Sequence, residues 1–143
     1  MEWETEPLLE LGLRLAAVAQ FAIALINLSL ERLMNWRADV ERMPLLIREV
    51  FRVHVIFITI TVATFALLTW RFAREMAART DPAAVWISAL IGVFWSIRSI
   101  MQWTHYSAIH WHGQHVRTAL HALLFLGYGA LGLLYFAAAF LDR

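Results

Sequence analysis

Four long apolar segments dominate this chain of 143 residues and leave little room for anything else. They cover residues 8–30, 45–70, 83–103 and 118–141, and about 20 residues is the length that a helix needs to cross a bilayer. In lipid the backbone must satisfy its own hydrogen bonds, so apolar segments of this length form helices. The sequence therefore predicts an all-α fold, an integral membrane four-helix up-down-up-down bundle, with a single domain over residues 1–143.

The composition agrees with a membrane protein. Hydrophobic residues make up 61% of the chain and charged residues 16%, whereas a soluble domain has about 25% charged residues. A net charge of +1 gives no basis for a nucleic-acid partner. The partners that we expect are the lipid bilayer and either other membrane subunits or further copies of this chain in a homo-oligomer.

The chain contains no cysteine, and this narrows the possible chemistry. Disulfides, thiolate metal sites, ordinary iron–sulfur clusters and covalently attached c-type haem are excluded. A metal ion would need histidine, carboxylate or other nitrogen and oxygen ligands. The sequence shows no nucleophile with a base and no glycine-rich phosphate loop, so it assigns no enzymatic reaction or catalytic residue.

The arginines give a weak signal for orientation. Six of them flank the first and third connections, and four flank the opposite side: Arg32, Arg37, Arg42, Arg48, Arg52 and Arg117, against Arg71, Arg74, Arg79 and Arg143. The positive-inside rule then predicts that the first and third connections are cytoplasmic and that both termini lie outside. We expect the bacterial inner membrane. The acidic start of the chain lacks the positive charge of a secretory signal, so the first segment is expected to stay in the mature protein.

Polar side chains accumulate at the end of the bundle that carries the first and third connections. A charged side chain within a spanning helix costs about 2.5 to 3.5 kcal/mol and faces the protein interior or a wet cavity. The pattern therefore predicts a ligand-binding site at this end, formed by Arg52, Arg98, Gln102, Arg117 and Glu31. Arg98 is expected to face the interior and to pair with Glu31 or Glu49.

Histidines reinforce this prediction, because five of the six lie between residues 105 and 121. We expect His54, His105 and His121, from three different helices, to lie at matched depth and converge on one site. Neutral imidazoles there would ligate a b-type haem or a metal ion, and the arginines would bind the haem propionates. Three further histidines are interpreted mainly as residues of the third connection and as weaker candidate ligands: His110, His112 and His115.

Two other functions remain open at this point. A pocket for a quinone or a lipid headgroup would use Arg98, Gln102 and His105, because arginine suits phosphate whereas histidine and glutamine suit carbonyls; Trp95 and Trp103 would flank it. A cofactor-free accessory or assembly subunit would instead use its polar residues to pair with partner helices. The leading hypothesis from the sequence is a haem- or metal-binding, redox-linked membrane subunit.

Overall fold

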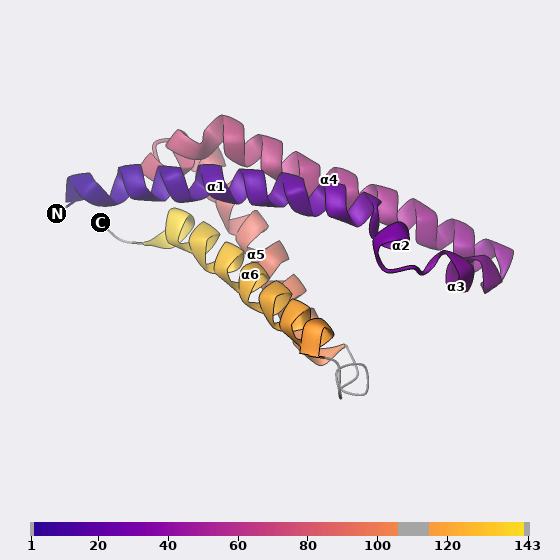
Figure 1. Cartoon of the computed structure of the whole chain (residues 1–143). Coiled ribbons are helices and arrows are strands. Elements are labelled where there is room, and N and C mark those ends of the chain that lie inside the picture. Colours follow the sequence, from indigo (N-terminus) through magenta and orange to yellow (C-terminus); the bar gives the residue numbers. More distant parts are fainter. Residues whose placement is uncertain (1, 106–114, 142–143) are drawn as a thin grey trace. The chain divides into compact units, whose positions relative to one another are not determined.

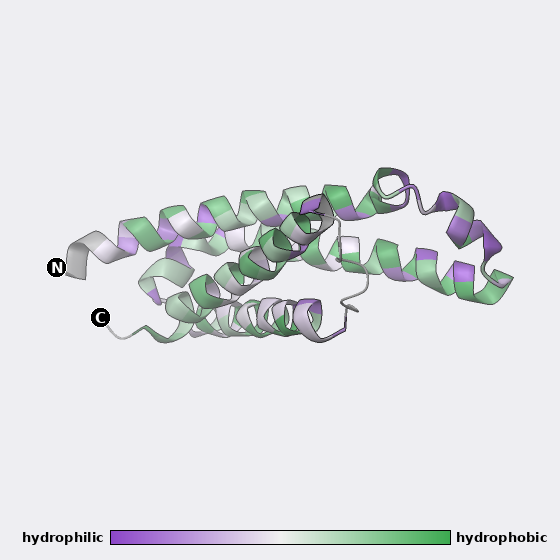
Figure 2. Cartoon of the chain, turned by 60° about the horizontal axis from the view of Figure 1, so that its bottom comes forward, coloured by the Kyte–Doolittle hydropathy of each residue, from purple (hydrophilic) through white to green (hydrophobic). Residues whose placement is uncertain are grey.

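The computed structural model describes residues 2–105 and 115–141, except for the side chains of residues 2–4, 116 and 117. Every element in this part of the chain is a helix (Figure 1). The helices are α1 (Glu2–Leu28), α2 (Leu30–Leu33), α3 (Arg37–Arg42), α4 (Leu45–Ala78), α5 (Pro82–Thr104) and α6 (His115–Phe140). The prediction of an all-α fold is confirmed. Four of the helices, α1, α4, α5 and α6, are long and apolar enough to cross a membrane, as their colouring in Figure 2 shows.

One helix continues past the end of its apolar segment, because polar residues can also form a helix. We predicted that the second segment ends at residue 70, but α4 continues to Ala78 with a local break at Phe72, where φ is −110° and ψ is 15°. Apart from Phe72, residues 71–78 are Arg, Ala, Glu and Met, which form helices well, and hydropathy does not detect this. At the start of α5 the prediction is confirmed, because Asp81 caps the helix by accepting a 2.8 Å hydrogen bond from the Ala83 amide, with Pro82 in the first turn.

The polar stretch between the first two apolar segments is not a simple loop, because it contains α2 and α3. Both short helices carry an acidic residue in the first turn and an arginine in the last, which complements the helix dipole. Asn35 separates them with a positive φ of 55°, a conformation that asparagine tolerates better than most residues.

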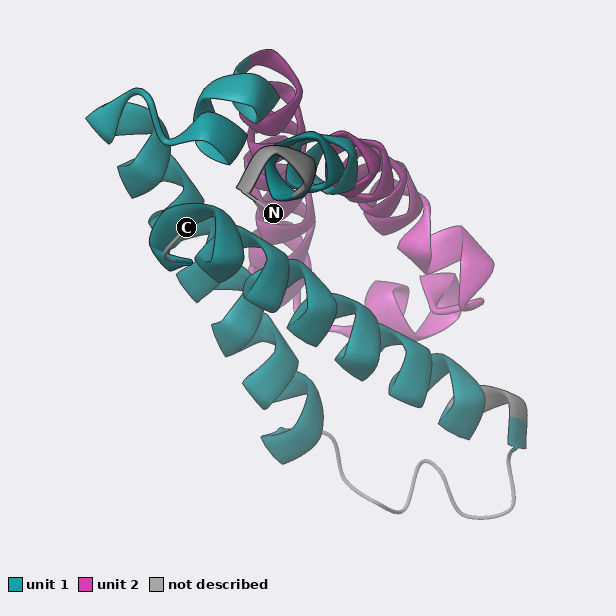
Figure 3. Cartoon of the chain, turned by 90° about the vertical axis from the view of Figure 1, so that its left-hand side faces the viewer, with its two compact units in different colours: residues 1–13, 72–143 teal, residues 14–71 magenta. Residues whose placement is uncertain are grey.

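The chain divides into two compact units, shown in Figure 3. Unit 1 contains residues 1–13 and 72–143, and unit 2 contains residues 14–71. The break at Phe72 in α4 coincides with the boundary between them.

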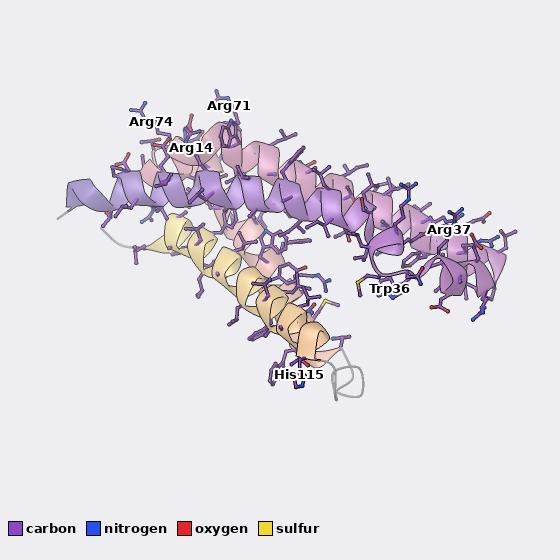
Figure 4. All side chains as sticks on the ribbon, viewed as in Figure 1. Arg14, Trp36, Arg37, Arg71, Arg74 and His115 are labelled. Atoms are coloured by element: carbon purple, nitrogen blue, oxygen red, sulfur yellow. The ribbon has the colours of Figure 1, made fainter. Side chains whose placement is uncertain are left out.

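In unit 2, α1 and α4 run antiparallel. The Arg14 guanidinium lies 5.3 Å from the centre of the Trp70 ring, and Glu31, just beyond α1, forms a 3.9 Å ion pair with Arg52. The start of α1 therefore lies beside the later part of α4, and the end of α1 lies near the earlier part of α4. Figure 4 shows the two ends of the unit, with Arg14 and Arg71 at one and Trp36 and Arg37 at the other.

Between these two contacts lies a span without charged residues. Residues 15–30 and 53–69 contain no Asp, Glu, Lys or Arg, and we call these two segments the charge-free span. From Arg52 to Trp70, α4 rises about 27 Å at about 1.5 Å per residue. The hydrocarbon core of a bilayer is about 30 Å thick. The charged and aromatic side chains of unit 2 are thus spaced as the two edges of a bilayer require.

Large apolar side chains cover much of the surface of the described helices, unlike the surface of a soluble protein. Large apolar side chains remain exposed along all four long helices, for example Leu46 at 71% and Leu133 at 73%, whereas buried positions include small or polar residues such as Ala24 and Gln20. A soluble chain rarely leaves so much contiguous apolar surface uncovered. The exposed surface therefore supports an integral membrane protein.

In unit 1, α5 and α6 form an antiparallel pair with a close approach at glycines. A Cβ added to Gly132 would lie 2.6 Å from the Ser96 Oγ atom and 3.3 Å from the Ser96 backbone nitrogen, and one added to Gly129 would lie 3.4 Å from Ser99 Oγ. One added to Gly127 would meet nothing within 4 Å. The absence of a side chain therefore permits the close approach of the helices at Gly129 and Gly132 but has no such role at Gly127.

Gly132→Ala should separate α5 from α6 and destabilise the protein by about 1 to 3 kcal/mol, the usual cost of overpacking. Gly127→Ala is the matched control, since it adds the same methyl group to open space and should be neutral or slightly stabilising. Unfolding midpoints in mixed detergent micelles, followed by circular dichroism, measure both. Equal midpoints for the two variants would contradict the close approach at Gly132.

Candidate functional site at one end of the α5–α6 pair

The buried face of α5 becomes polar toward its C-terminal end. Trp95, Ser99 and Gln102 are spaced by four and three residues and are all buried, Gln102 to 3% exposure. This spacing places them on one side of the helix. Toward the start of α5, the buried residues on this face are smaller, for example Ala84 and Ser88.

Two buried side chains on this face bond across to α6. Ser99 Oγ donates a 3.0 Å hydrogen bond to the Phe125 carbonyl, and Gln102 Nε2 lies 2.9 Å from His121 Nδ1. Elsewhere, Ser88 and Thr69 donate to the carbonyl four residues earlier in their own helix. A polar side chain bonded within its own helix is self-sufficient, whereas one bonded across helices fixes their relative position.

An aromatic and cationic stack lies next to this pair. The Trp95 ring stacks on Tyr128 with centroids 5.1 Å apart and an interplanar angle of 25°. The Arg98 guanidinium lies 5.3 Å from the centre of the Tyr128 ring. Such a cation–π contact offsets part of the cost of placing a guanidinium in an apolar region.

The direction of Arg98 argues against a simple reach to lipid phosphates. Trp86 and Trp103 are 69% and 70% exposed and lie about 26 Å apart along α5, as expected for the two aromatic belts of a membrane helix. Arg98 is five residues inside Trp103, about 7 Å. Helical side chains leave the backbone toward the N-terminus, which here is the middle of the apolar segment. Tyr128 also stacks on Trp95, three residues before Arg98. The contact with Tyr128 therefore directs the guanidinium toward the middle of α5 and away from Trp103.

Gln102 keeps one polar atom unsatisfied. Its Oε1 is buried and has no hydrogen-bond partner among the described residues. If the amide is rotated by 180°, Oε1 accepts from His121 Nδ1–H and the amide nitrogen then lacks an acceptor. In both orientations, one end of a buried amide remains available, and such a group costs about 1 to 3 kcal/mol unless something binds it.

Two more predicted site residues, Glu31 and Arg52, lie in unit 2 and pair with each other. Their side chains are 27% and 50% exposed, so the pair is a half-exposed ion pair. Arg48 donates a 3.3 Å hydrogen bond to the Glu41 carbonyl, and His54 is exposed. Arg98 lies in unit 1, so its predicted pairing with Glu31 or Glu49 stays a prediction.

The remaining histidines are less constrained than His121. His105 ends α5, is exposed and lies 2.8 Å from Thr104 Oγ1 through its Nδ1 atom. His115 is exposed at the start of α6. His110, His112 and the Arg117 side chain lie outside the described residues. Convergence of His54 with His105 and His121 stays a prediction, because His54 belongs to the other unit.

No group of three or more His, Asp or Glu side chains that could hold a metal ion occurs within residues 2–105 and 115–141. No family model, curated protein or solved structure matches this chain. Its candidate site therefore rests on the chemistry of the side chains alone.

Sequence reasoning missed Ser99 as a polar contact between helices. Its spacing from Trp95 and Gln102 was visible, but a serine in an apolar helix gives no signal of its own, because it usually bonds within its helix. The facing glycine, Gly129, provides the only sequence hint, because a small residue lets α6 come close enough for Ser99 to reach the Phe125 carbonyl.

A double-mutant cycle tests the bond between Gln102 and His121. His121→Leu should destabilise the protein by about 1 to 3 kcal/mol because it leaves the buried amide of Gln102 with no partner. Adding Gln102→Leu should recover most of that loss, since both polar groups are then absent. Detergent unfolding of the wild type, the two single variants and the double variant measures the coupling. Additive effects would show that the two side chains do not depend on each other.

Proposed function

We propose that this chain is an integral membrane protein that binds the polar head of a membrane-dissolved amphiphile, a quinone or a phospholipid, between α5 and α6. The observation that carries the proposal is Gln102, a buried amide bonded to His121 that still has an unsatisfied polar atom. Arg98 lies one turn away on the same helix, which puts the two side chains about 5 to 6 Å apart at their Cβ atoms. The four apolar helices support insertion in the bilayer.

The chemistry of these side chains selects the ligand class. Arg98 has no ion pair with a carboxylate in the described part of unit 1, so its guanidinium can donate to a phosphate or a carbonyl oxygen. Gln102 Oε1 accepts from a hydroxyl or ammonium group. A quinone–quinol couple and a phospholipid headgroup both offer such groups next to an apolar tail, which would follow the exposed apolar surface of the helices.

Haem or metal binding is the second candidate, and it is favoured by one contact. In the rotated orientation of its amide, Gln102 accepts a hydrogen bond from His121 Nδ1–H, and this bond would orient the imidazole for ligation through Nε2. A metal-binding histidine is commonly oriented in this way by a hydrogen bond to its other nitrogen. His105, at the end of α5 in the same unit, would supply the second ligand, and Arg98 would bind the propionates of a b-type haem.

Protein purified in mild detergent distinguishes these candidates. We expect an organic extract to contain quinone or phospholipid near one molecule per chain. Arg98→Leu should lower the affinity by about 10- to 150-fold and deplete the ligand, because it removes one charge-assisted hydrogen bond of roughly 1.5 to 3 kcal/mol. Arg74→Leu, which removes an exposed arginine, is the control and should retain the ligand. A Soret band selects haem, and stoichiometric metal without that band selects a histidine site. Protein that has neither ligand nor metal would contradict both candidates and would favour the accessory-subunit hypothesis.

The up-down topology can be tested separately, because the chain has no cysteine of its own. Single cysteines at Thr5 and Arg79 should react with an impermeant thiol reagent from one side of the membrane, and those at Asp39 and Gln114 from the other side. Four spans with both termini on one side require this result. Labelling of Asp39 and Gln114 from opposite sides would exclude the four-span arrangement. The positive-inside rule predicts that Asp39 and Gln114 face the cytoplasm.

A further inference from the structure

Helix α4 has two faces of different character within unit 2. One face includes Val62, Ala66 and Thr69, which are buried. The opposite face is exposed and apolar, and we call it the α4 stripe. Its members are Leu46, Val50, Val53, Phe57, Ile60, Thr64 and Leu67. Only 11% of the most apolar window of α4 is buried, the smallest share among the four long helices.

The α4 stripe has the spacing of a coiled coil. Its positions alternate by four and three residues over three heptads, and its six apolar members are 53% to 71% exposed. Thr64, the seventh member, donates its hydroxyl hydrogen to the Ile60 carbonyl at 2.8 Å, so it adds no unpaired donor to the stripe. Apolar residues that repeat every 3.5 positions favour left-handed packing against another helix. Contact with lipid requires no such repeat.

The stripe also extends past the apolar layer. Leu46, 71% exposed, lies six residues, about 9 Å, beyond Arg52, which marks one edge of the charge-free span. Val50 lies beyond the same edge and is 57% exposed. Hydrocarbon tails do not reach apolar side chains beyond this edge, so burying them against another protein helix would be favourable.

The polar residues beside the stripe point to another α4 as the covering helix, because a Glu carboxylate can accept a hydrogen bond from a His imidazole. When Val50, Phe57 and Thr64 are the a positions of the heptad, Glu49 takes a g position and His54 the e position of the next heptad. In a parallel pair, residues at g and the following e face each other across the two helices. Both side chains are exposed, and neither forms a hydrogen bond or an ion pair with another described residue.

We infer that two copies of this chain associate through the α4 stripe as a parallel, twofold-symmetric pair, with Glu49 of each copy facing His54 of the other. Two copies inserted in the same orientation have parallel α4 helices, as this register requires. The inference rests on the membrane insertion of the proposed function but is independent of its ligand. It gives His54, otherwise a polar side chain exposed at the edge of the apolar span, a partner.

Cysteine cross-linking in native membranes tests the interface. Single cysteines at Val50, Val53, Phe57 and Ile60 should form dimers with a short thiol cross-linker. Those at Phe51, Val55, Ile58 and Val62, on the other side of the same helix and at the same depths, should not. A yield that peaks on the second set, is uniform around the helix or is absent overturns the inference. Labelling of the Asp39 cysteine from one side only, in the same membranes, verifies insertion independently, so failure of the dimer is distinguishable from failure of the membrane proposal.

Charge exchange tests the register. His54→Glu places like charges opposite Glu49 twice per dimer and should weaken association about three- to thirtyfold, measured by energy transfer between labelled copies in vesicles. Glu49→Arg combined with His54→Glu should restore it. Thr5→Glu is the control for added charge outside the stripe and should leave association unchanged. Loss of association in the exchanged variant would overturn the pairing of Glu49 with His54.

Discussion

The structure depends on one constraint: an apolar surface about 27 Å high must be flanked at both ends by charged or interfacial aromatic side chains. In unit 2, Arg14 with Trp70 closes one end and Glu31 with Arg52 closes the other. In unit 1, the exposed rings of Trp86 and Trp103 mark the corresponding ends of α5. These contacts need not be strong. Their positions along the helices, rather than their energies, determine which part of each helix can lie in the apolar layer.

The α5–α6 pair shows how polar groups are tolerated inside such a layer. Ser88 donates its hydroxyl hydrogen to the Ala84 carbonyl within its own helix. Ser99 and Gln102 instead bond to α6, and Gln102 keeps an unsatisfied atom. A buried amide that is only partly satisfied is costly in a low dielectric. That cost is the physical reason to look for a ligand at this end of the pair rather than elsewhere in unit 1.

Ligand binding and association between copies are proposed for different parts of the molecule. The ligand proposal concerns the buried face that α5 shares with α6, and the association proposal concerns the exposed face of α4 in unit 2. In the first, close packing at Gly129 and Gly132 is what brings the polar groups together. In the second, a regular apolar stripe remains uncovered by its own unit. Protein surfaces that are regular and uncovered, and that extend past the hydrocarbon layer, are suited to a second protein rather than to lipid.

Sequence alone determined the helical class and the four apolar segments, because a chain without internal polar breaks over about 20 residues can satisfy its backbone in lipid only as a helix. It also singled out Arg98, Gln102 and His121, since polar groups are expensive there. It could not choose the partner of each: Gln102 bonds to His121, Arg98 lies over Tyr128, Glu31 pairs with Arg52, and His105 lies beside Thr104. Those pairings depend on the rotation of each helix about its axis and on the register between neighbours. Helix rotation and register follow from the packing of side chains such as Ser96 against Gly132, which only the tertiary structure decides.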